Sequence, residues 1–156
     1  MNIPFSPPDI TEEEIESVAE AMRSGWITTG PKTKELERKM AEFTHTNRGV
    51  CLNSATSCME MALRLFEIGP GDEVIVPAYT YTASASVVCH VGATLRLVDV
   101  EKGTFHIDYA AVESMINENT KAIIPVDLGG VMVDYDRIRA IVESKKSLFR
   151  PSSKMR

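Results

Sequence analysis

The sequence predicts an α/β fold in three layers, α/β/α, with a mostly parallel sheet between two layers of helices. Short β-prone runs alternate with segments long enough for helices throughout residues 49–144, and this alternation is typical of parallel strands joined by right-handed crossovers. The 156 residues are 44% hydrophobic and 25% charged. This composition provides one sizeable core and excludes disordered and collagen-like chains.

Two helices are expected in the first 48 residues, which form a helical entry segment. Thr11 and Glu14 have the spacing of a capping box, and apolar residues then recur at steps of three and four, which predicts a helix over residues 11–24. Gly25 ends it, and residues 26–31 form an ordered connector because glycine and proline both oppose a continuous helix. The second helix carries three apolar residues on one face: Leu36, Met40 and Phe43.

Strands and helices alternate after residue 48. The β-prone runs are residues 50–52, 73–76, 94–98 and 121–126. The helices are expected at residues 57–67, 82–91, 108–117 and 134–144. We therefore divide the chain into the entry segment 1–48, a β/α segment 49–144 and a basic segment 145–156, whose lack of periodicity favours a solvated loop or tail over a binding patch.

Charge and cysteine usage exclude several classes of function. The formal net charge is −5, from 17 basic and 22 acidic residues, which disfavours nucleic-acid binding. Cys51, Cys58 and Cys89 include no Cys-x-x-Cys pair, so free thiols in a reducing compartment are expected, with the cytoplasm as the predicted location. We predict no signal peptide and no membrane span, because the apolar runs are short.

The turn over residues 53–58 is the first candidate for chemistry. Small hydroxyl residues lie between a predicted strand and a predicted helix, where free backbone N–H groups and the helix dipole favour a phosphate. An alternative is that Thr56 or Ser57 merely caps the helix, since Ser57 and Glu60 have capping-box spacing. The residues themselves leave both interpretations open.

Two further segments follow predicted strands and therefore reach the same edge of the sheet. Tyr79 and Tyr81 could present a ring to a planar ligand there, although packing against the protein is the alternative that the sequence favours. Residues 127–130 follow the fourth predicted strand, and a plain turn is the favoured interpretation. The three histidines lie far apart and have no metal-ligand spacing.

Taken together, these stretches resemble the DegT/DnrJ/EryC1/StrS sugar aminotransferase family. The resemblance is carried by segments 24–31, 53–57, 68–77, 79–81, 92–93 and 99–100, in their order and spacing. It implies part of the large domain of a type I pyridoxal-phosphate (PLP) transferase that works as a homodimer. It also implies amino transfer, from a donor such as glutamate, to a keto-sugar carried on a nucleotide.

The resemblance also implies roles for individual residues. Ala55, Thr56 and Ser57 would hold the cofactor phosphate, and Tyr81 would stack on the pyridine ring. In the family, the connector corresponding to residues 26–31 lies near the active site at the dimer interface. The resemblance therefore assigns three residues to a loop that contacts the substrate or the dimer partner: Trp26, Thr29 and Gly30.

Two catalytic residues of the family have no counterpart in this sequence. They are the lysine that forms the Schiff base and the aspartate that pairs with the pyridinium nitrogen. We therefore expect an amino-terminal portion that is inactive alone and associates with a second copy or a complementary chain. The alternative is a non-catalytic module that binds phosphate or PLP, or an inactive fragment.

Overall fold

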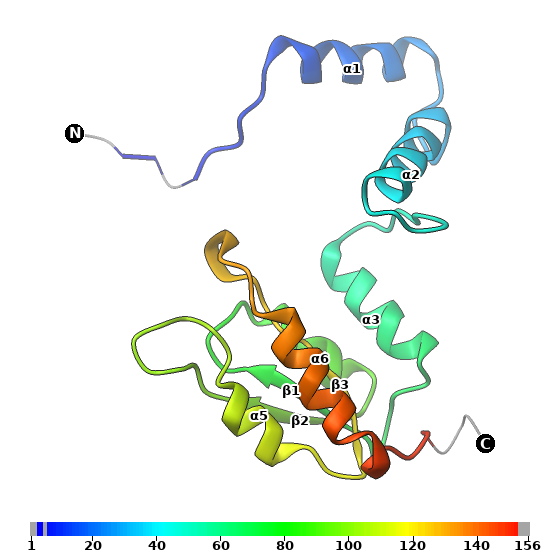
Figure 1. Ribbon diagram of the computed structural model, residues 1–156. Helices are drawn as coiled ribbons and strands as arrows, with labels where there is room; N and C mark the ends of the chain where they lie inside the picture. The colour runs from blue at the N-terminus through cyan, green and yellow to red at the C-terminus, as the bar shows by residue number, and fades with distance from the viewer. Residues whose placement is uncertain (1–2, 5, 153–156) are drawn as a thin grey trace. The chain divides into compact units, whose positions relative to one another are not determined.

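The computed structural model describes residues 3–4 and 6–152, and the basic residues Lys154 and Arg156 lie outside this range. The chain divides into two compact units, one ending at Cys51 and the other beginning at Leu52 (Figure 1). Among the described residues, no helix combines the length and apolar character needed to cross a membrane.

The first unit contains the two expected helices, α1 (Glu12–Arg23) and α2 (Pro31–Phe43). The predicted capping box is present at α1, where Thr11 caps the helix and its backbone N–H donates to the Glu14 carboxylate over 2.6 Å. Pro31 begins α2, a position at which its missing N–H costs no helical hydrogen bond. An ion pair of 2.8 Å between Lys32 and Glu20 joins the two helices.

The apolar faces of α1 and α2 are largely uncovered within this unit. No residue of α1 is buried, and Ala41 is the only buried residue of α2. Met22 is 68% exposed and Phe43 is 81% exposed. Helices with one apolar stripe normally bury it against another element, so this unit does not form a core by itself.

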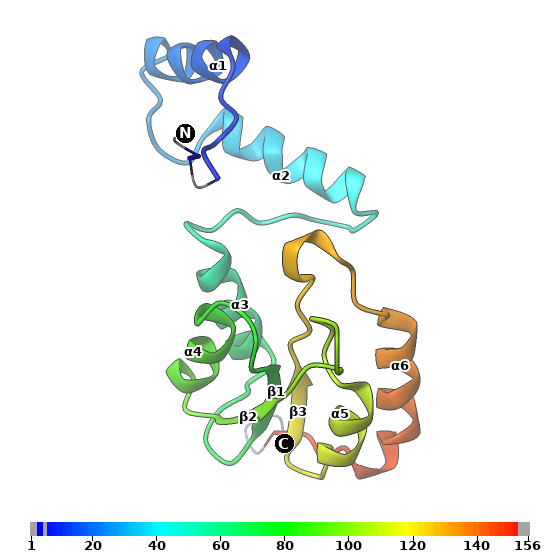
Figure 2. The ribbon, with the colours of Figure 1, turned by 90° about the vertical axis from the view of Figure 1, so that its left-hand side faces the viewer.

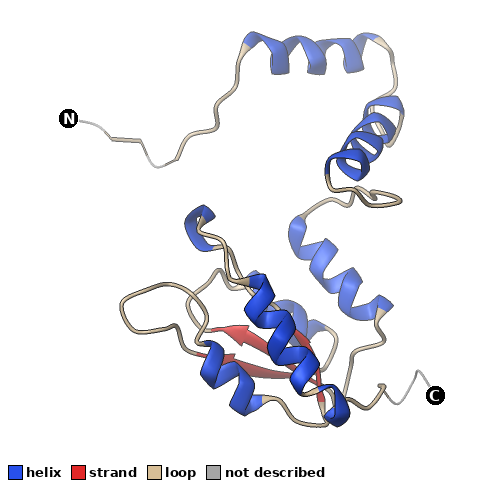
Figure 3. Ribbon diagram, viewed as in Figure 1, coloured by secondary structure: helices blue, strands red, loops and turns tan. Residues whose placement is uncertain are grey.

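The second unit is built on a parallel sheet. Its strands, drawn in red in Figure 3, are β1 (Glu73–Pro77), β2 (Thr94–Val98) and β3 (Thr120–Ile123). Their order in the sheet is β2-β1-β3. Glu73 pairs with Thr94 on one side of β1, and Ile75 pairs with Ile123 on the other. The predicted α/β class with a parallel sheet is confirmed.

Helices cover both faces of this sheet. They are α3 (Ala55–Leu65), α4 (Ala83–His90), α5 (Tyr109–Met115) and α6 (Tyr135–Ser144), with short 3-10 turns η1 (Leu128–Gly130) and η2 (Lys146–Leu148). Figure 2 shows α3 and α4 on one side of the strands and α5 and α6 on the other. Val74 and Val76 pack with the first pair and Ile75 with the second, all fully buried. This alternation follows the two-residue period of a strand.

Two strand predictions are corrected. Residues 50–52 form no strand, and Val50 is 74% exposed, because in the described part of the chain no strand lies beside them to pair with. β3 ends at Ile123 rather than at residue 126. Only the N–H of Ile124 continues the pairing, donating to the Ile75 carbonyl over 2.9 Å, because the next donor on β1 would be Pro77, which has no backbone N–H.

The described part of the predicted basic tail is a packed loop. Residues 146–148 form η2, and Ser152 is only 4% exposed. The Ser152 Oγ lies 2.8 Å from the Glu67 carbonyl oxygen and 2.5 Å from Asp72 Oδ2. The loop is thereby fixed against the turn that precedes β1.

Candidate functional site

The candidate site lies at the edge of the second unit where the parallel strands end. α3 begins at this same edge, since it runs antiparallel to the strands that follow it (Figure 2). The segments after β1, β2 and β3 also emerge there. In parallel α/β sheets this edge is where ligands bind.

Ser54 caps the amino terminus of α3. Its backbone is extended, and its Oγ accepts a hydrogen bond from the Ser57 N–H over 3.1 Å. The first N–H groups of a helix have no acceptor within the helix, so those of Ala55 and Thr56 are left for an external acceptor. Their direction and the helix dipole both favour an anion.

This geometry corrects one detail of the interpretations that the sequence left open, and phosphate binding stays a prediction. The alternative in which Thr56 or Ser57 caps the helix is wrong about the capping residue, because Ser54 is the cap. The Thr56 and Ser57 side chains are half-buried at the helix end, and the Ser57 Oγ accepts a hydrogen bond from the Ser54 Oγ over 3.0 Å. The sequence signal that was missed is Ser54 itself, which lies three residues before the backbone N–H that it caps.

The two tyrosines of the second candidate segment behave differently. Tyr79 stacks on Phe105, with ring centroids 5.1 Å apart and planes 17° from parallel. Tyr81 is 80% exposed. Packing, the alternative favoured by the sequence, therefore applies to Tyr79, whereas the ring of Tyr81 is open to a ligand.

Asp127, which follows β3, is engaged within its own loop. Its Oδ1 accepts from the Val133 N–H over 2.8 Å, and its Oδ2 accepts from the Tyr135 hydroxyl over 2.9 Å. Burial raises the pKa of Tyr135, and the hydrogen bond to the Asp127 carboxylate raises it further. The phenol therefore stays protonated and keeps donating, which supports the interpretation of residues 127–130 as a structural turn.

Trp26, Thr29 and Gly30 come together in the first unit. The indole Nε1–H of Trp26 donates to the Thr29 carbonyl over 2.9 Å. A Cβ on Gly30 would come within 2.1 Å of the indole ring, so only glycine lets the ring lie this close. Trp26 and Gly30, but not Thr29, line a hollow of about 470 Å³ between α1 and α2.

The described lysines of the second unit are not gathered around the amino terminus of α3. Lys121 lies near the start of β3, and Lys145 and Lys146 follow α6, at the opposite end of the sheet (Figure 2). Lys102 lies in an exposed turn after β2. Within the described ranges, no three His, Cys, Asp or Glu side chains are arranged to hold a metal ion.

A family comparison agrees with this geometry. The model of the DegT/DnrJ/EryC1/StrS aminotransferase family matches residues 8–149. The chain belongs to this family. The match extends over both units, so the connector 26–31 and the turn 53–57 both fall within it.

Several solved structures are similar to this chain. One is a Streptococcus pneumoniae protein described as a sugar aminotransferase, whose structure is known in apo, PMP and PLP forms. It is 60% identical to this chain with a TM-score of 0.94, and the match to the PMP form covers 98% of this chain and 38% of that protein. DesV of S. venezuelae, whose structure contains a ketimine intermediate, is 35% identical with a TM-score of 0.81. That match covers 86% of this chain and 36% of DesV. An aminotransferase of Psychrobacter cryohalolentis is 32% identical with a TM-score of 0.84, and the match covers 92% of this chain and 37% of that protein. The chain thus spans less than two-fifths of these relatives.

Proposed function

We propose that this chain is the cofactor-phosphate-binding part of a PLP-dependent sugar aminotransferase. The observation that carries the proposal is the amino terminus of α3, where Ser54 takes the capping role and leaves the N–H groups of Ala55 and Thr56 to an anion. Membership of the DegT/DnrJ/EryC1/StrS aminotransferase family supports it. The PLP and PMP forms of the Streptococcus pneumoniae relative support the choice of cofactor.

The residues present fit the phosphate of PLP. A phosphate at a helix amino terminus is stabilised by backbone N–H donors and by the helix dipole. The Thr56 and Ser57 hydroxyls are available as additional donors, because they lie at the same helix end. Ala55, Thr56 and Ser57 would therefore hold and orient the phosphate, and through it the rest of the cofactor.

Tyr81 fits the aromatic ring of the cofactor. Its exposed side chain follows β1 at the sheet edge where α3 begins. Aromatic rings stack with offset faces, and a stacked tyrosine would exclude water from one face of the pyridine. PLP supplies the electron sink that transamination requires.

The lysine that would hold PLP covalently and the carboxylate that would pair with its ring nitrogen are not supplied by the described residues near this site. Asp127 already has both oxygens occupied. We propose that both groups come from the part of a family-length protein that this chain does not span. The homodimer, the nucleotide-linked keto-sugar, the glutamate donor, the cytoplasmic location and the roles of Trp26, Thr29 and Gly30 remain predictions from the resemblance.

A chimera tests the phosphate role. The 156 residues replace the matched part of the Streptococcus pneumoniae protein in one continuous polypeptide, and the affinities for PLP and for pyridoxal, which lacks the phosphate, are compared. Thr56→Val together with Ser57→Ala should reduce the preference for PLP by about tenfold or more, because charge-assisted donors to the phosphate are lost. Thr82→Val, in the segment after β1, is the control and should leave the preference unchanged.

Equal loss of PLP and pyridoxal binding in the double variant would indicate general damage to the site and contradict a specific phosphate role. An unchanged preference would place the phosphate elsewhere.

A further inference from the structure

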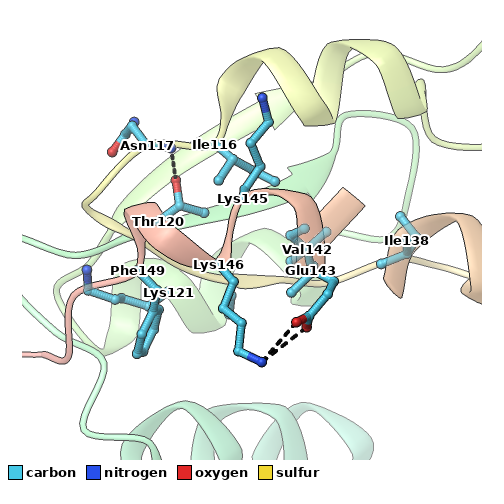
Figure 4. Close-up of a pocket in the computed structure, with 12 residues that line it drawn as sticks. Ile116, Asn117, Thr120, Lys121, Ile138, Val142, Glu143, Lys145, Lys146 and Phe149 are labelled. Atoms are coloured by element: carbon cyan, nitrogen blue, oxygen red, sulfur yellow. Dashed lines mark hydrogen bonds and ion pairs between the residues drawn. The ribbon is translucent and has the colours of Figure 1, made fainter. Parts of the chain in front are cut away.

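Ser84 differs from the other buried polar residues of the described chain in its hydrogen bonding. These residues are Asp72, Ser84, Thr120 and Ser152. The Thr120 hydroxyl accepts from the Asn117 N–H over 3.1 Å (Figure 4), and Ser152 bonds Asp72 over 2.5 Å. Ser84 is only 7% exposed, yet its hydroxyl has no hydrogen-bond partner among the described residues. Buried hydroxyls in proteins normally have a partner, so the missing one calls for a physical explanation.

The Ser84 hydroxyl faces an opening rather than the closed core. In the part of the chain that the structure describes, every fully enclosed side-chain nitrogen or oxygen has a hydrogen-bond partner. The unpartnered Ser84 oxygen therefore keeps a small accessible surface. Ser86, two residues further along the same helix, is different, because its hydroxyl donates to the Ala83 carbonyl over 3.2 Å. Ser84 is thus free to donate to a group from outside the chain.

Ser84 lies in the first turn of α4, at the edge of the sheet where α3 also begins. β1 ends at Pro77 and α4 begins at Ala83, so α4 starts at the carboxyl ends of the strands. The side chain lies on the same face of α4 as Val87 and Val88, which are buried one turn later. Because the Cα–Cβ bonds of a helix tilt toward its amino terminus, the Ser84 side chain is directed toward this edge.

The amino termini of α3 and α4 lie side by side. Both helices cover the same face of the sheet (Figure 2), and Met59 of α3 packs against the apolar cluster that contains Val87 of α4. Ala55 and Ser84 each lie about one helical turn before these packed residues, in the direction of the same edge. The axes of packed helices are about 8–10 Å apart, a spacing that a phosphate hydrogen-bonded to both helices can bridge.

We propose that Ser84 is a further cofactor-binding residue, whose hydroxyl donates to an oxygen of the PLP phosphate held at the amino terminus of α3. The choice of ligand rests on the proposed function. The start of α4 supports it, because no side chain caps this helix and its dipole adds to that of α3 in favouring an anion. The phosphate also supplies the acceptor that the Ser84 hydroxyl lacks within the described chain.

Ser84→Ala in the chimera tests this inference. Its affinity for PLP should fall by about tenfold or more, because a hydrogen bond to a charged group is lost, whereas its affinity for pyridoxal should be unchanged. The thermal midpoint of the chimera without cofactor should not fall, because Ser84 makes no hydrogen bond within the described chain. Ser84→Cys keeps the volume of the side chain but has only a weak S–H donor, so it should also lose PLP affinity. The control is Ser86→Ala, whose hydroxyl already has an acceptor in its own helix and whose loss should leave the preference for PLP unchanged.

Three outcomes would overturn the inference. These are an unchanged affinity of Ser84→Ala for PLP, an equal loss of PLP and pyridoxal binding, and a lower thermal midpoint without cofactor, which would give Ser84 a structural role. The double variant Thr56→Val with Ser57→Ala tests the amino terminus of α3 separately. If that variant loses the preference for PLP and Ser84→Ala keeps it, only the role of Ser84 fails. If the double variant keeps the preference, the proposed phosphate site itself fails.

Discussion

Ser54 determines what the amino terminus of α3 can bind. The Ser54 hydroxyl accepts a hydrogen bond from the Ser57 N–H, and the backbone N–H groups of Ala55 and Thr56 have no acceptor within the helix. Ser54→Ala should lower the free energy of unfolding by about 1 kcal/mol, since a cap is lost. The measurement is urea unfolding of the 156-residue chain, with Ser114→Ala as the control, because that exposed hydroxyl bonds only a carbonyl of its own helix and caps no helix start.

Ser54→Asp separates capping from phosphate binding at the same position. Aspartate is as good a cap as serine, so the free energy of unfolding should be retained. Its negative charge would lie beside the proposed phosphate and should reduce the preference of the chimera for PLP over pyridoxal. Retained PLP preference together with retained stability would argue against a phosphate at this helix end.

Glu60 in α3 contacts His90 at the end of α4 and also pairs with Arg64 one turn further along α3. Arg64 and then His90 lower its pKa, and His90 Nδ1 lies 2.9 Å from its carboxylate. Because the pKa is lower in the folded chain, the stabilisation is present above the unfolded pKa and is lost as the pH falls through the folded one. Arg64→Gln should raise the Glu60 pKa toward its ordinary value in an NMR titration, and Arg139→Gln should not change it.

Among the elements, β1 is the centre of the second unit. Ile75 is fully buried in the core formed with α5 and α6. Ile75→Ala should lower the free energy of unfolding by about 2–5 kcal/mol, and Ile75→Val by about 0.5–1.5 kcal/mol. Urea unfolding distinguishes them, and equal effects of the two substitutions would contradict the tight packing described for this core.

Elements whose signals are local were predictable from the sequence. The capping box of Thr11 and Glu14 and the apolar run of β1 both specify their structures within a few residues. The strand at residues 50–52 was wrong because a strand depends on neighbours that a local pattern does not reveal. The cap at Ser54 was missed for a related reason, since Ser54 and Ser57 have similar propensities and only the position of the helix start distinguishes them.

At the scale of the whole molecule, uncovered apolar surface is the main feature. Within their own unit the apolar faces of α1 and α2 are uncovered, and within the second unit an apolar groove lies beside β3. The composition fits one complete domain, yet the chain spans less than two-fifths of the relatives that it matches. That this chain functions together with further polypeptide stays a prediction.

Amide NMR of the chimera tests the proposed phosphate site most directly. Selective labelling with ¹⁵N-alanine and ¹⁵N-threonine reports on the N–H groups of Ala55 and Thr56, which are assigned by substitution. Addition of PLP should shift both resonances strongly, whereas pyridoxal should shift them little, because only PLP brings a phosphate to the helix end. Binding of PLP that leaves both resonances unmoved would contradict the assignment of α3 as the phosphate site.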